Sequence, residues 1–440
     1  MVAEADIKPW FRPASNSYIL HNASIVDVAK GSIQSNVTVT VENGNITSLE
    51  ASSTEQPSKP GFITVDCTGL YLSPGLIDCH VHLIATPGFD SLAASFSNPE
   101  SVSLLRQPYV CAQMLHRGFT TIRDCGGAHS AIKEVIEDGI FPGPRLFIAG
   151  HALSQSGGHA DFRTKHDHSA CCGGATTGLG RVCNGVAECM QAVREEIRCG
   201  SDFIKIMGSG GVSSPTDKIS HLQFLPEEIR AMVSCAKNAG TYVTAHAYTP
   251  EAIRHCVENG VKGIEHGNFL DEATAKLMAE KGAYLTPTLI TYDQMASQKW
   301  EGFLPASEKS KNTEVLDAGL RALKIASEAG VTICYGSDLL GPLGAAQTHE
   351  FVLRSKALSP LEVLRSATMN AARMLGQEDC LGQIEEGFKA DILFLAANPL
   401  EDVTILDKPE EYVRSVMKEG RVYKSRWNGL AEDANPPVRI

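Results

Sequence analysis

Hydrophobic residues in the N-terminal segment occur in short runs that are separated by turn-forming residues. Three of these runs have β character and cover positions 18–20, 23–27 and 37–41. Asn43-Gly44 stands between two β-rich runs, and an Asn-Gly pair in this position is the strongest short-range signal of a β-hairpin. The segment therefore predicts short strands and no helix.

From Leu72 onward the pattern changes to apolar strands that alternate with helical stretches of roughly 10–15 residues, which is typical of repeated βα units. One helical stretch covers 226–236 and ends near Gly240, as helix C-termini commonly do. Eight strands are predicted, at residues 76–78, 120–124, 145–149, 203–207, 242–246, 263–266, 284–287 and 332–336. This alternation predicts an α/β fold with a (β/α)₈ barrel, also called a TIM barrel.

Short strands return after about Asp379, at 387–395, 413–417 and 421–423. Because both terminal segments have β character and flank the barrel in sequence, we expect them to pair into one small β-sandwich. The predicted domains are the barrel, residues 74–378, and the sandwich, residues 1–73 together with 379–440.

Length and charge agree with a large catalytic domain and a smaller one. The chain has 440 residues, and its 39 basic against 51 acidic residues give a net charge of −12 without a block of like charges. We therefore expect no nucleic-acid partner. No apolar run approaches the roughly 20 residues that span a bilayer, and the first residues do not resemble a signal sequence. The 13 cysteines lack the spacing of a disulfide framework, which fits reduced thiols. Together these features predict a cytoplasmic enzyme without a membrane partner.

His80 and His82 follow the first predicted strand of the barrel. Residues two apart on a strand point to the same side, so both imidazoles can face one ion. Neutral imidazole is the commonest metal ligand of this kind. An isolated His-x-His pair often arises by chance. The predicted strand directly before this pair favours a metal-binding role over a chance occurrence.

Four more candidate ligands fall at the ends of later predicted strands, where barrel enzymes assemble their active sites. They are Lys205, His246, His266 and Asp338. A single histidine at a strand end is more often a hydrogen-bonded structural residue, but four such residues on one barrel face favour a shared site. The neighbours of Lys205 within 203–207 are all apolar, which favours a buried lysine with a special partner over an ordinary lysine paired with an acid.

The order of these motifs resembles the amidohydrolase superfamily, and specifically its imidazolonepropionase-like branch, which contains Xaa-Pro dipeptidases and fungal ochratoxinase. The resemblance covers nearly the whole chain, including the split sandwich. It implies a centre of two divalent metal ions, usually zinc, although the ligand types also admit manganese, iron or cobalt.

The resemblance also implies the role of each ligand. His80, His82 and Asp338 hold the more buried ion, and His246 and His266 hold the other. Lys205 bridges both ions as an N6-carboxylated residue; an ammonium has no lone pair for a metal, whereas a carbamate presents two anionic oxygens. The ions then lower the pKa of a bridging water to give hydroxide. Asp338 accepts the proton of this water and passes it to the leaving amine.

Two residues outside the ligand set resemble substrate contacts of the dipeptidases. His159, in the Gly-rich stretch 156–161, matches a histidine that orients the carbonyl or carboxylate of the substrate. Tyr248, two residues after His246, matches a tyrosine that also contacts the substrate. Ochratoxinase has a histidine at the latter position, so the chain is more similar to the dipeptidases there.

Residues 159–183 include a stretch rich in histidine and cysteine, His166 to Cys172. These residue types could form a second metal site. A long loop over the mouth of the barrel is favoured, because no paired Cys-x-x-Cys spacing is present.

Together these features predict an amidohydrolase that cleaves a peptide-like amide bond of a small carboxylate-bearing substrate. Xaa-Pro and other dipeptides, N-acyl amino acids and ochratoxin-like amides belong to this class. One alternative is a cyclic amide hydrolase or heterocycle deaminase, against which Lys205 argues, because deaminases of the superfamily commonly work with one metal and without this lysine. The other alternative is a non-catalytic barrel scaffold, against which the complete ligand set argues. The resemblance also implies a homo-oligomer.

Overall fold

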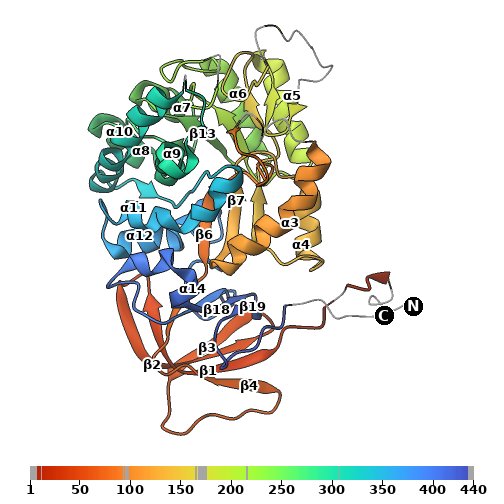
Figure 1. The fold of residues 1–440 in the computed structure, drawn as a ribbon, viewed down its shortest axis with the longest axis vertical. Coiled ribbons are helices and arrows are strands. Elements are labelled where there is room, and N and C mark those ends of the chain that lie inside the picture. Colours follow the sequence, from red (N-terminus) through yellow and green to blue (C-terminus); the bar gives the residue numbers. More distant parts are fainter. Residues whose placement is uncertain are drawn as a thin grey trace.

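The computed structural model in Figure 1 describes residues 7–10, 12–92, 94, 99–163, 166, 176–214, 217–306 and 308–434. The α/β character and the parallel strands that the sequence predicts are both present. The strands form three sheets: two are dominated by parallel pairs, and one is built from both ends of the chain. No helix in the described part of the chain is long and apolar enough to cross a membrane.

The first parallel sheet has the order β6-β7-β8. Its strands are β6 (Leu76–Val81), β7 (Phe119–Asp124) and β8 (Arg145–Ile148), connected by the helices α3 (Glu100–His116) and α4 (Ser130–Glu137). Every residue of β6 and β7 is buried. Polar side chains on these two strands must therefore find partners inside the protein, because burial without a partner is costly.

The second sheet has the order β10-β11-β9-β12-β13-β14-β15-β16, and only the β10–β11 pair in it is antiparallel. Its strands are β9 (Ala152–Ser154), β10 (Thr176–Thr177), β11 (Gly180–Val182), β12 (Ile204–Met207), β13 (Val243–Ala247), β14 (Gly263–His266), β15 (Tyr284–Thr286) and β16 (Thr332–Ile333). The helices between and after these strands are α5 (Gly185–Arg198), α6 (Pro226–Asn238), α7 (Pro250–Glu258), α8 (Glu272–Lys281), α9 (Leu289–Ala296), η1 (Gln298–Trp300), α10 (Lys309–Glu328), η2 (Gly341–His349), α11 (Glu350–Arg354), α12 (Pro360–Ser366) and α13 (Met369–Met374).

Backbone hydrogen bonds connect the two parallel sheets on both sides of the first one. The amide of Asp338 donates to the carbonyl of His80 at 2.8 Å. On the other side, the amide of Asp202 donates to the carbonyl of Ile148, also at 2.8 Å. The strands of the described residues do not pair in one continuous ring, so the closed barrel stays a prediction.

The terminal sheet has the order β19-β18-β17-β5-β1-β2-β3, and β4 pairs with β1. Its strands are β1 (Ser17–Asp27), β2 (Ser32–Glu42), β3 (Asn45–Ala51), β4 (Phe62–Asp66), β5 (Tyr71–Pro74), β17 (Ile392–Leu395), β18 (Val413–Lys418) and β19 (Arg421–Ser425), with η3 (Val403–Asp407) and α14 (Pro409–Tyr412) between β17 and β18. β17 lies antiparallel to β5 and places Leu393 opposite Ser73. Figure 1 shows the two ends of the chain meeting in this sheet, below the parallel strands. The pairing of both ends is thus present, whereas the two packed layers of a sandwich stay a prediction.

Several predicted elements differ from the structure in extent. The strand expected at 387–395 is confined to β17, because Gly387 has φ +88° and forms a turn. The strand expected at 332–336 is reduced to two residues. The prediction also misses β4, β5, β9, β10 and β11, which have between two and five residues each.

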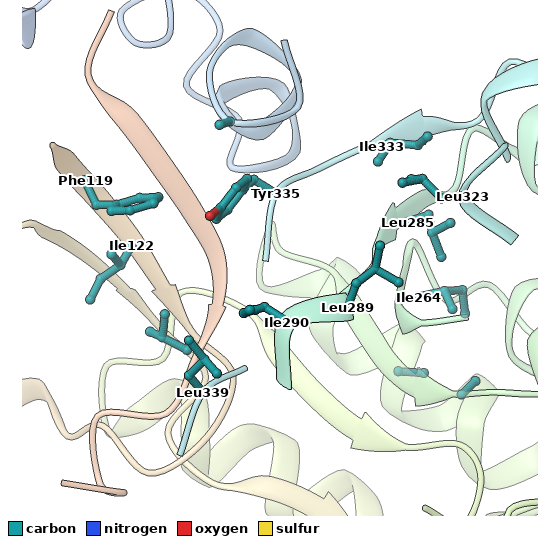
Figure 2. Close-up of a cluster of buried hydrophobic side chains, with 14 of the residues drawn as sticks. Phe119, Ile122, Ile264, Leu285, Leu289, Ile290, Leu323, Ile333, Tyr335 and Leu339 are labelled. Atoms are coloured by element: carbon teal, nitrogen blue, oxygen red, sulfur yellow. The ribbon is translucent and has the colours of Figure 1, made fainter. Parts of the chain in front are cut away.

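One hydrophobic core runs between the two parallel sheets. Figure 2 shows Phe119 and Ile122 of β7 on one side, and Leu285 and Ile264 on the strands of the other sheet. Tyr335 lies between these groups, and its hydroxyl donates to the carbonyl of Gln347 at 2.6 Å. The packed core holds the carboxyl ends of the parallel strands in fixed positions, which is what a precise polar site requires.

Candidate metal centre

Five of the six predicted metal ligands lie near or beyond the carboxyl ends of parallel strands, and Lys205 is the second residue of β12. His80 lies on β6, Lys205 on β12, His246 on β13 and His266 at the end of β14, while His82 and Asp338 follow β6 and β16. Their imidazole rings form a continuous series of contacts: the ring centroids are 5.2 Å apart for His80 and His82, 5.0 Å for His80 and His266, and 4.6 Å for His246 and His266. The structure therefore brings together residues that are up to 258 positions apart in sequence (338 − 80).

His80 and His82 point their Nε2 atoms at each other. Nδ1 of His80 lies 2.8 Å from Glu265 Oε2, and Nδ1 of His82 lies 2.9 Å from the carbonyl oxygen of Gly126. Both partners are acceptors, so each Nδ1 carries a hydrogen and the Nε2 of a neutral ring presents a lone pair. Burial lowers the pKa of His82, but the hydrogen bond and charge of Asp338 raise it above its ordinary value. The two Nε2 atoms are 3.3 Å apart. This is the tautomer that hydrogen-bonded carboxylates and carbonyls fix in metal-binding histidines.

Asp338 completes a cluster of electron-pair donors. Its Oδ1 lies 3.5 Å from Nε2 of His80 and 3.3 Å from Nε2 of His82. Burial alone would raise the pKa of Asp338, but the neighbouring His80 and His82 lower it below its ordinary value. The ligand atoms of His80, His266 and Asp338 all lie within 4.8 Å of one another. Two imidazoles and a carboxylate that converge in this way can donate electron pairs to a bound cation. Nitrogen and carboxylate ligands suit zinc and similar divalent transition metals.

His246 and His266 form the other half of the cluster. Nδ1 of His266 lies 2.8 Å from Thr288 Oγ1 and 2.9 Å from Tyr292 Oη, which orients the ring. Burial, followed by the charge of His80, holds the pKa of His266 well below its usual value. Burial and the neighbouring His159 do the same for the pKa of His246. Both rings are therefore neutral at physiological pH, the form in which imidazole binds metals.

Lys205 lies near these histidines, with 1% of its surface exposed. Burial lowers the pKa of His80 to about 4, and the charge of Lys205 contributes to this effect. The same charge also lowers the pKa of His246 and of His266. Among the described residues, no side chain or carbonyl makes a hydrogen bond or ion pair with its ammonium group. A fully buried, unpaired ammonium beside four imidazoles is unfavourable, so this position fits a lysine that is modified or metal-associated in the working protein.

Sequence reasoning missed the residues that support the ligands. Glu265 is fully buried and accepts hydrogen bonds from Arg123 and Thr244, each at 2.5 Å, in addition to His80. Burial would raise the pKa of Glu265, but the charges of Arg123 and His80 hold it well below its ordinary value. Glu265 is thus an anion that fixes the orientation of His80. An acid within the predicted strand 263–266, directly before the candidate ligand His266, is the signal that could have identified it.

Two of the candidate ligands have unusual backbone conformations. His266 has φ +74° and Asp338 has φ +50°, in the left-handed region that residues other than glycine seldom adopt. Such conformations cost of order 1–3 kcal/mol and concentrate at functional sites. Both side chains approach His80: the ring centroids of His266 and His80 are 5.0 Å apart, and Oδ1 of Asp338 lies 3.5 Å from Nε2 of His80.

His159 and Tyr248, the predicted substrate contacts, lie at the edge of the cluster. The ring of His159 stacks on His246 with centroids 4.2 Å apart, and its Nδ1 lies 2.7 Å from Ser214 Oγ. Tyr248 is 2% exposed, and its hydroxyl lies 2.7 Å from that of Tyr292. The structure thus places both residues next to the predicted ligands.

Asp217 is a further residue near this edge that the sequence did not reveal. One of its oxygens lies 3.7 Å from Nδ1 of His159, and it accepts hydrogen bonds from Ser214 and from Gln223, the latter at 2.9 Å. Asp217 and Ser214 together fix the orientation of the His159 ring.

The predicted loop of residues 159–183 is described only in part. Residues 164, 165 and 167–175, which include His168, Cys171 and Cys172, lie outside the described residues. His166 is exposed. The second metal site that this stretch could form therefore stays untested.

Comparison with known proteins identifies the family of the chain. The model of the amidohydrolase family matches residues 71–423. Ochratoxinase of Aspergillus niger is 34% identical over 379 residues, which cover 83% of this chain and 78% of that protein. A crystal structure of a prolidase complexed with N-methylphosphonate-L-proline is 40% identical with a TM-score of 0.89, and covers 93% of this chain and 100% of that one. A structure of a Xaa-Pro dipeptidase with bound methionine in the active site is 29% identical with a TM-score of 0.83, at 93% and 100% coverage.

The cluster of histidines, lysine and aspartate on the parallel strands is a candidate metal site. The chain belongs to the amidohydrolase family, and it is a hydrolase that acts on amides. Members of this family generally bind metal ions, and the described residues include groups that could hold one.

Proposed function

We propose that the protein is a binuclear metal-dependent amidohydrolase that cleaves a peptide-like amide of a small carboxylate-bearing substrate. The observation that carries this proposal is the convergence of the six ligand candidates, with the Nε2 lone pairs of His80 and His82 directed at each other beside Asp338. His80, His82 and Asp338 would hold one ion, and His246 and His266 the other. N6-carboxylated Lys205 would bridge the two ions, and zinc is the ion we expect.

A dipeptide with C-terminal proline is the substrate that the similarities favour. The prolidase and the Xaa-Pro dipeptidase share 40% and 29% of their aligned residues with this chain and are covered over their full length. Tyr248, which the sequence assigns to the dipeptidase-like pattern, lies among the ligand candidates with its ring 4.8 Å from that of His246. Other dipeptides, N-acyl amino acids and ochratoxin-like amides belong to the same chemical class.

The residues of this chain would contribute binding, orientation and proton transfer. Bound divalent ions would lower the pKa of water and polarise the scissile carbonyl. Asp338, which its neighbours keep ionised, would accept a proton from that water and deliver it to the leaving amine. His159, fixed through Nδ1 by Ser214, has Nε2 available for the carbonyl or carboxylate of the substrate.

The arrangement of the sheets supports two further parts of the proposal. We infer that the two parallel sheets, which backbone hydrogen bonds join on both sides, belong to a (β/α)₈ barrel formed by residues 74–378. The terminal sheet would then be the small β-sandwich domain of residues 1–73 and 379–440. A homo-oligomer stays a prediction.

A hydrolysis panel tests the substrate. The zinc-loaded protein is incubated with Xaa-Pro dipeptides, dipeptides without proline, N-acyl amino acids, an ochratoxin-like amide, and hydantoin-like and purine-like rings. We expect release of the free amino acid from the linear amides, with Xaa-Pro dipeptides cleaved fastest. Ring opening or ammonia release without cleavage of any linear amide would contradict the proposal and favour the alternative enzymes.

Substitution of Lys205 tests the bridging role. Lys205→Ala should lose bound metal and activity, and added short carboxylates such as acetate or propionate should restore part of both, because they can supply the missing anionic oxygens. Metal content is measured by elemental analysis, and Lys237→Ala, at an exposed helix position, serves as the control. Two ions per chain bound beside an unmodified Lys205, as read from native mass spectrometry, would contradict the role.

A further inference from the structure

A cavity of about 620 Å³ lies at the junction of the terminal sheet and the first parallel sheet. Its walls come from the N-terminal segment, the end of α4, the start of β8, the β2–β3 turn and the β18–β19 hairpin. Figure 1 shows α4 above the β18–β19 hairpin and the N-terminal segment beside it. No candidate metal ligand lines this cavity, so it is distinct from the site described above.

The lining of the cavity is strongly basic in a chain whose net charge is −12. It contains three acidic residues, Glu137, Asp138 and Glu419. Against these stand seven basic residues, Lys8, Arg12, Lys133, Arg145, Lys389, Lys418 and Arg421. Such a concentration of one sign in a concave surface raises the local concentration of ligands of the opposite sign.

Three of the basic residues are neutralised by carboxylates. Lys8 pairs with Asp138 at 2.8 Å and Lys133 pairs with Asp202 at 2.7 Å. Arg145 contacts both Asp391, at 2.8 Å, and Glu419, at 2.5 Å.

The other four cations have no carboxylate partner among the described residues. Lys418 is 5% exposed and donates to the carbonyl of Gly143 at 2.8 Å. Arg421 donates to the carbonyl of Pro13. The side chain of Lys389 makes no hydrogen bond or ion pair with a described residue.

Arg12 is the clearest sign of a missing partner. Its Nη1 lies 3.5 Å from the Tyr423 hydroxyl, whereas its Nε and Nη2 are inaccessible to solvent and have no hydrogen-bond partner among the described residues. Buried donors without acceptors are rare and costly in native proteins. Burial lowers the pKa of Arg12, and the positive charge of Arg421 adds to this effect. Arg12 thus adds uncompensated positive charge to the wall of the cavity, which an anion bound there would offset.

We propose that this cavity binds a small organic phosphate. A phosphate group accepts several charge-assisted hydrogen bonds at once, and guanidinium groups such as those of Arg12 and Arg421 match its geometry. The volume lies in the range of small-molecule sites, roughly 300–1,000 Å³, so it leaves space for an organic group beside the phosphate. Lys389 and Lys418 would add further positive charge.

Binding to this cavity can be measured with the metal-loaded protein and glycerol phosphate as the probe. We expect saturable binding of one equivalent by isothermal titration calorimetry, and a rise in Tm, because the ligand binds only the folded protein. The double variant Lys389→Gln and Arg421→Gln should bind at least tenfold more weakly. The control double variant Lys237→Gln and Lys276→Gln changes the charge equally at exposed helix positions outside the cavity and should bind within twofold of the wild type.

Further arms of the experiment identify the ligand class. Lys389→Gln alone changes a side chain without contacts, so it should fold normally and still weaken binding. Binding of inorganic phosphate with the same affinity as glycerol phosphate, and with a loss of affinity in the same variants, would support the site. That result would also show that the phosphate group is its main determinant. Tighter binding of succinate than of glycerol phosphate would overturn the phosphate assignment. Absence of saturable binding to the wild type, or equal binding to the wild type and the cavity variants, would overturn the site itself.

Discussion

Glu265 determines which nitrogen of His80 faces the other ligand candidates. It is ionised and accepts the Nδ1 hydrogen of His80, and loss of such a supporting carboxylate typically reduces metal affinity 10–100-fold. Glu265→Gln should therefore weaken metal binding by roughly this factor, measured by competition with a chelating dye. Thr244→Val removes a different hydrogen bond to the same carboxylate and should change the affinity much less. Equal affinity losses in the two variants would show that the contact with His80 has no special role.

Lys418 gives a prediction about pH. Burial is the main cause that lowers its pKa to about 8, Glu419 and Asp391 raise it, and Arg145 and Arg12 lower it. The unfolded chain holds this proton more tightly than the folded one, so the folded protein gains stability as the pH rises above 8 and loses it as the pH falls through 8. Relative to Lys418→Met, the free energy of unfolding of the wild type should rise by about 2 kcal/mol between pH 7 and pH 9.5, at about 1.4 kcal/mol per unit. Urea denaturation in phosphate-free buffer measures this difference, and a constant or falling difference would contradict the depressed pKa.

At the scale of single residues, the sequence identified side chains that act through their position on a strand. His80, Lys205, His246 and His266 could be found because strand ends and ligand residue types are both visible in the sequence. Glu265 could not be assigned, because its role depends on which strands are neighbours. The same holds for Arg12, whose unpaired donors are visible only once the terminal segments have met.

At the scale of elements, the β2–β3 hairpin depends on its two-residue turn. Asn43 and Gly44 have φ +51° and +78°, as a type I′ turn requires. A Cβ on Gly44 would lie 2.9 Å from the carbonyl oxygen of Glu419, whereas a Cβ on Gly61, at φ +82°, would meet nothing within 4 Å. Gly61→Ala should therefore cost about 1 kcal/mol for its conformation alone, and Gly44→Ala at least 1 kcal/mol more. Urea denaturation compares the two variants, and equal costs would mean that the hairpin moves away from Glu419 without penalty.

The sequence predicted elements with strong hydrophobic patterns and missed short ones. β6, β7, β12, β13 and β14 were placed to within one to three residues at each end. Strands such as β5 and β9 have only four and three residues, too few for a period to be recognised. Whether parallel strands close into one barrel depends on pairings at the margins of the sheets, which no local pattern encodes.

At the scale of the whole molecule, one hydrophobic core contains side chains from both the terminal and the central segments. Val26 of β1, Leu393 of β17 and Val416 of β18 belong to the same core cluster as Phe119 and Leu115. The other face of the terminal sheet has a second cluster, which contains Phe394 and packs against Trp427. Because the central core includes side chains of the terminal sheet, neither part retains its full core without the other.

This shared core predicts that the molecule unfolds as one cooperative unit. Phe394 is fully buried and lies opposite Leu72 of β5, so Phe394→Ala should cost about 3–5 kcal/mol. In a background where Trp10 and Trp300 are replaced by phenylalanine, fluorescence of Trp427 reports the terminal sheet, and loss of hydrolytic activity reports the site. Both transitions should coincide and shift together to lower temperature, while Ile63→Ala, at a position 47% exposed, should shift neither by more than a degree or two. A shift of the Trp427 fluorescence transition without a shift of the activity transition would mean that the terminal sheet unfolds independently. A ligand in the basic cavity would then stabilise only the contact between two separate domains.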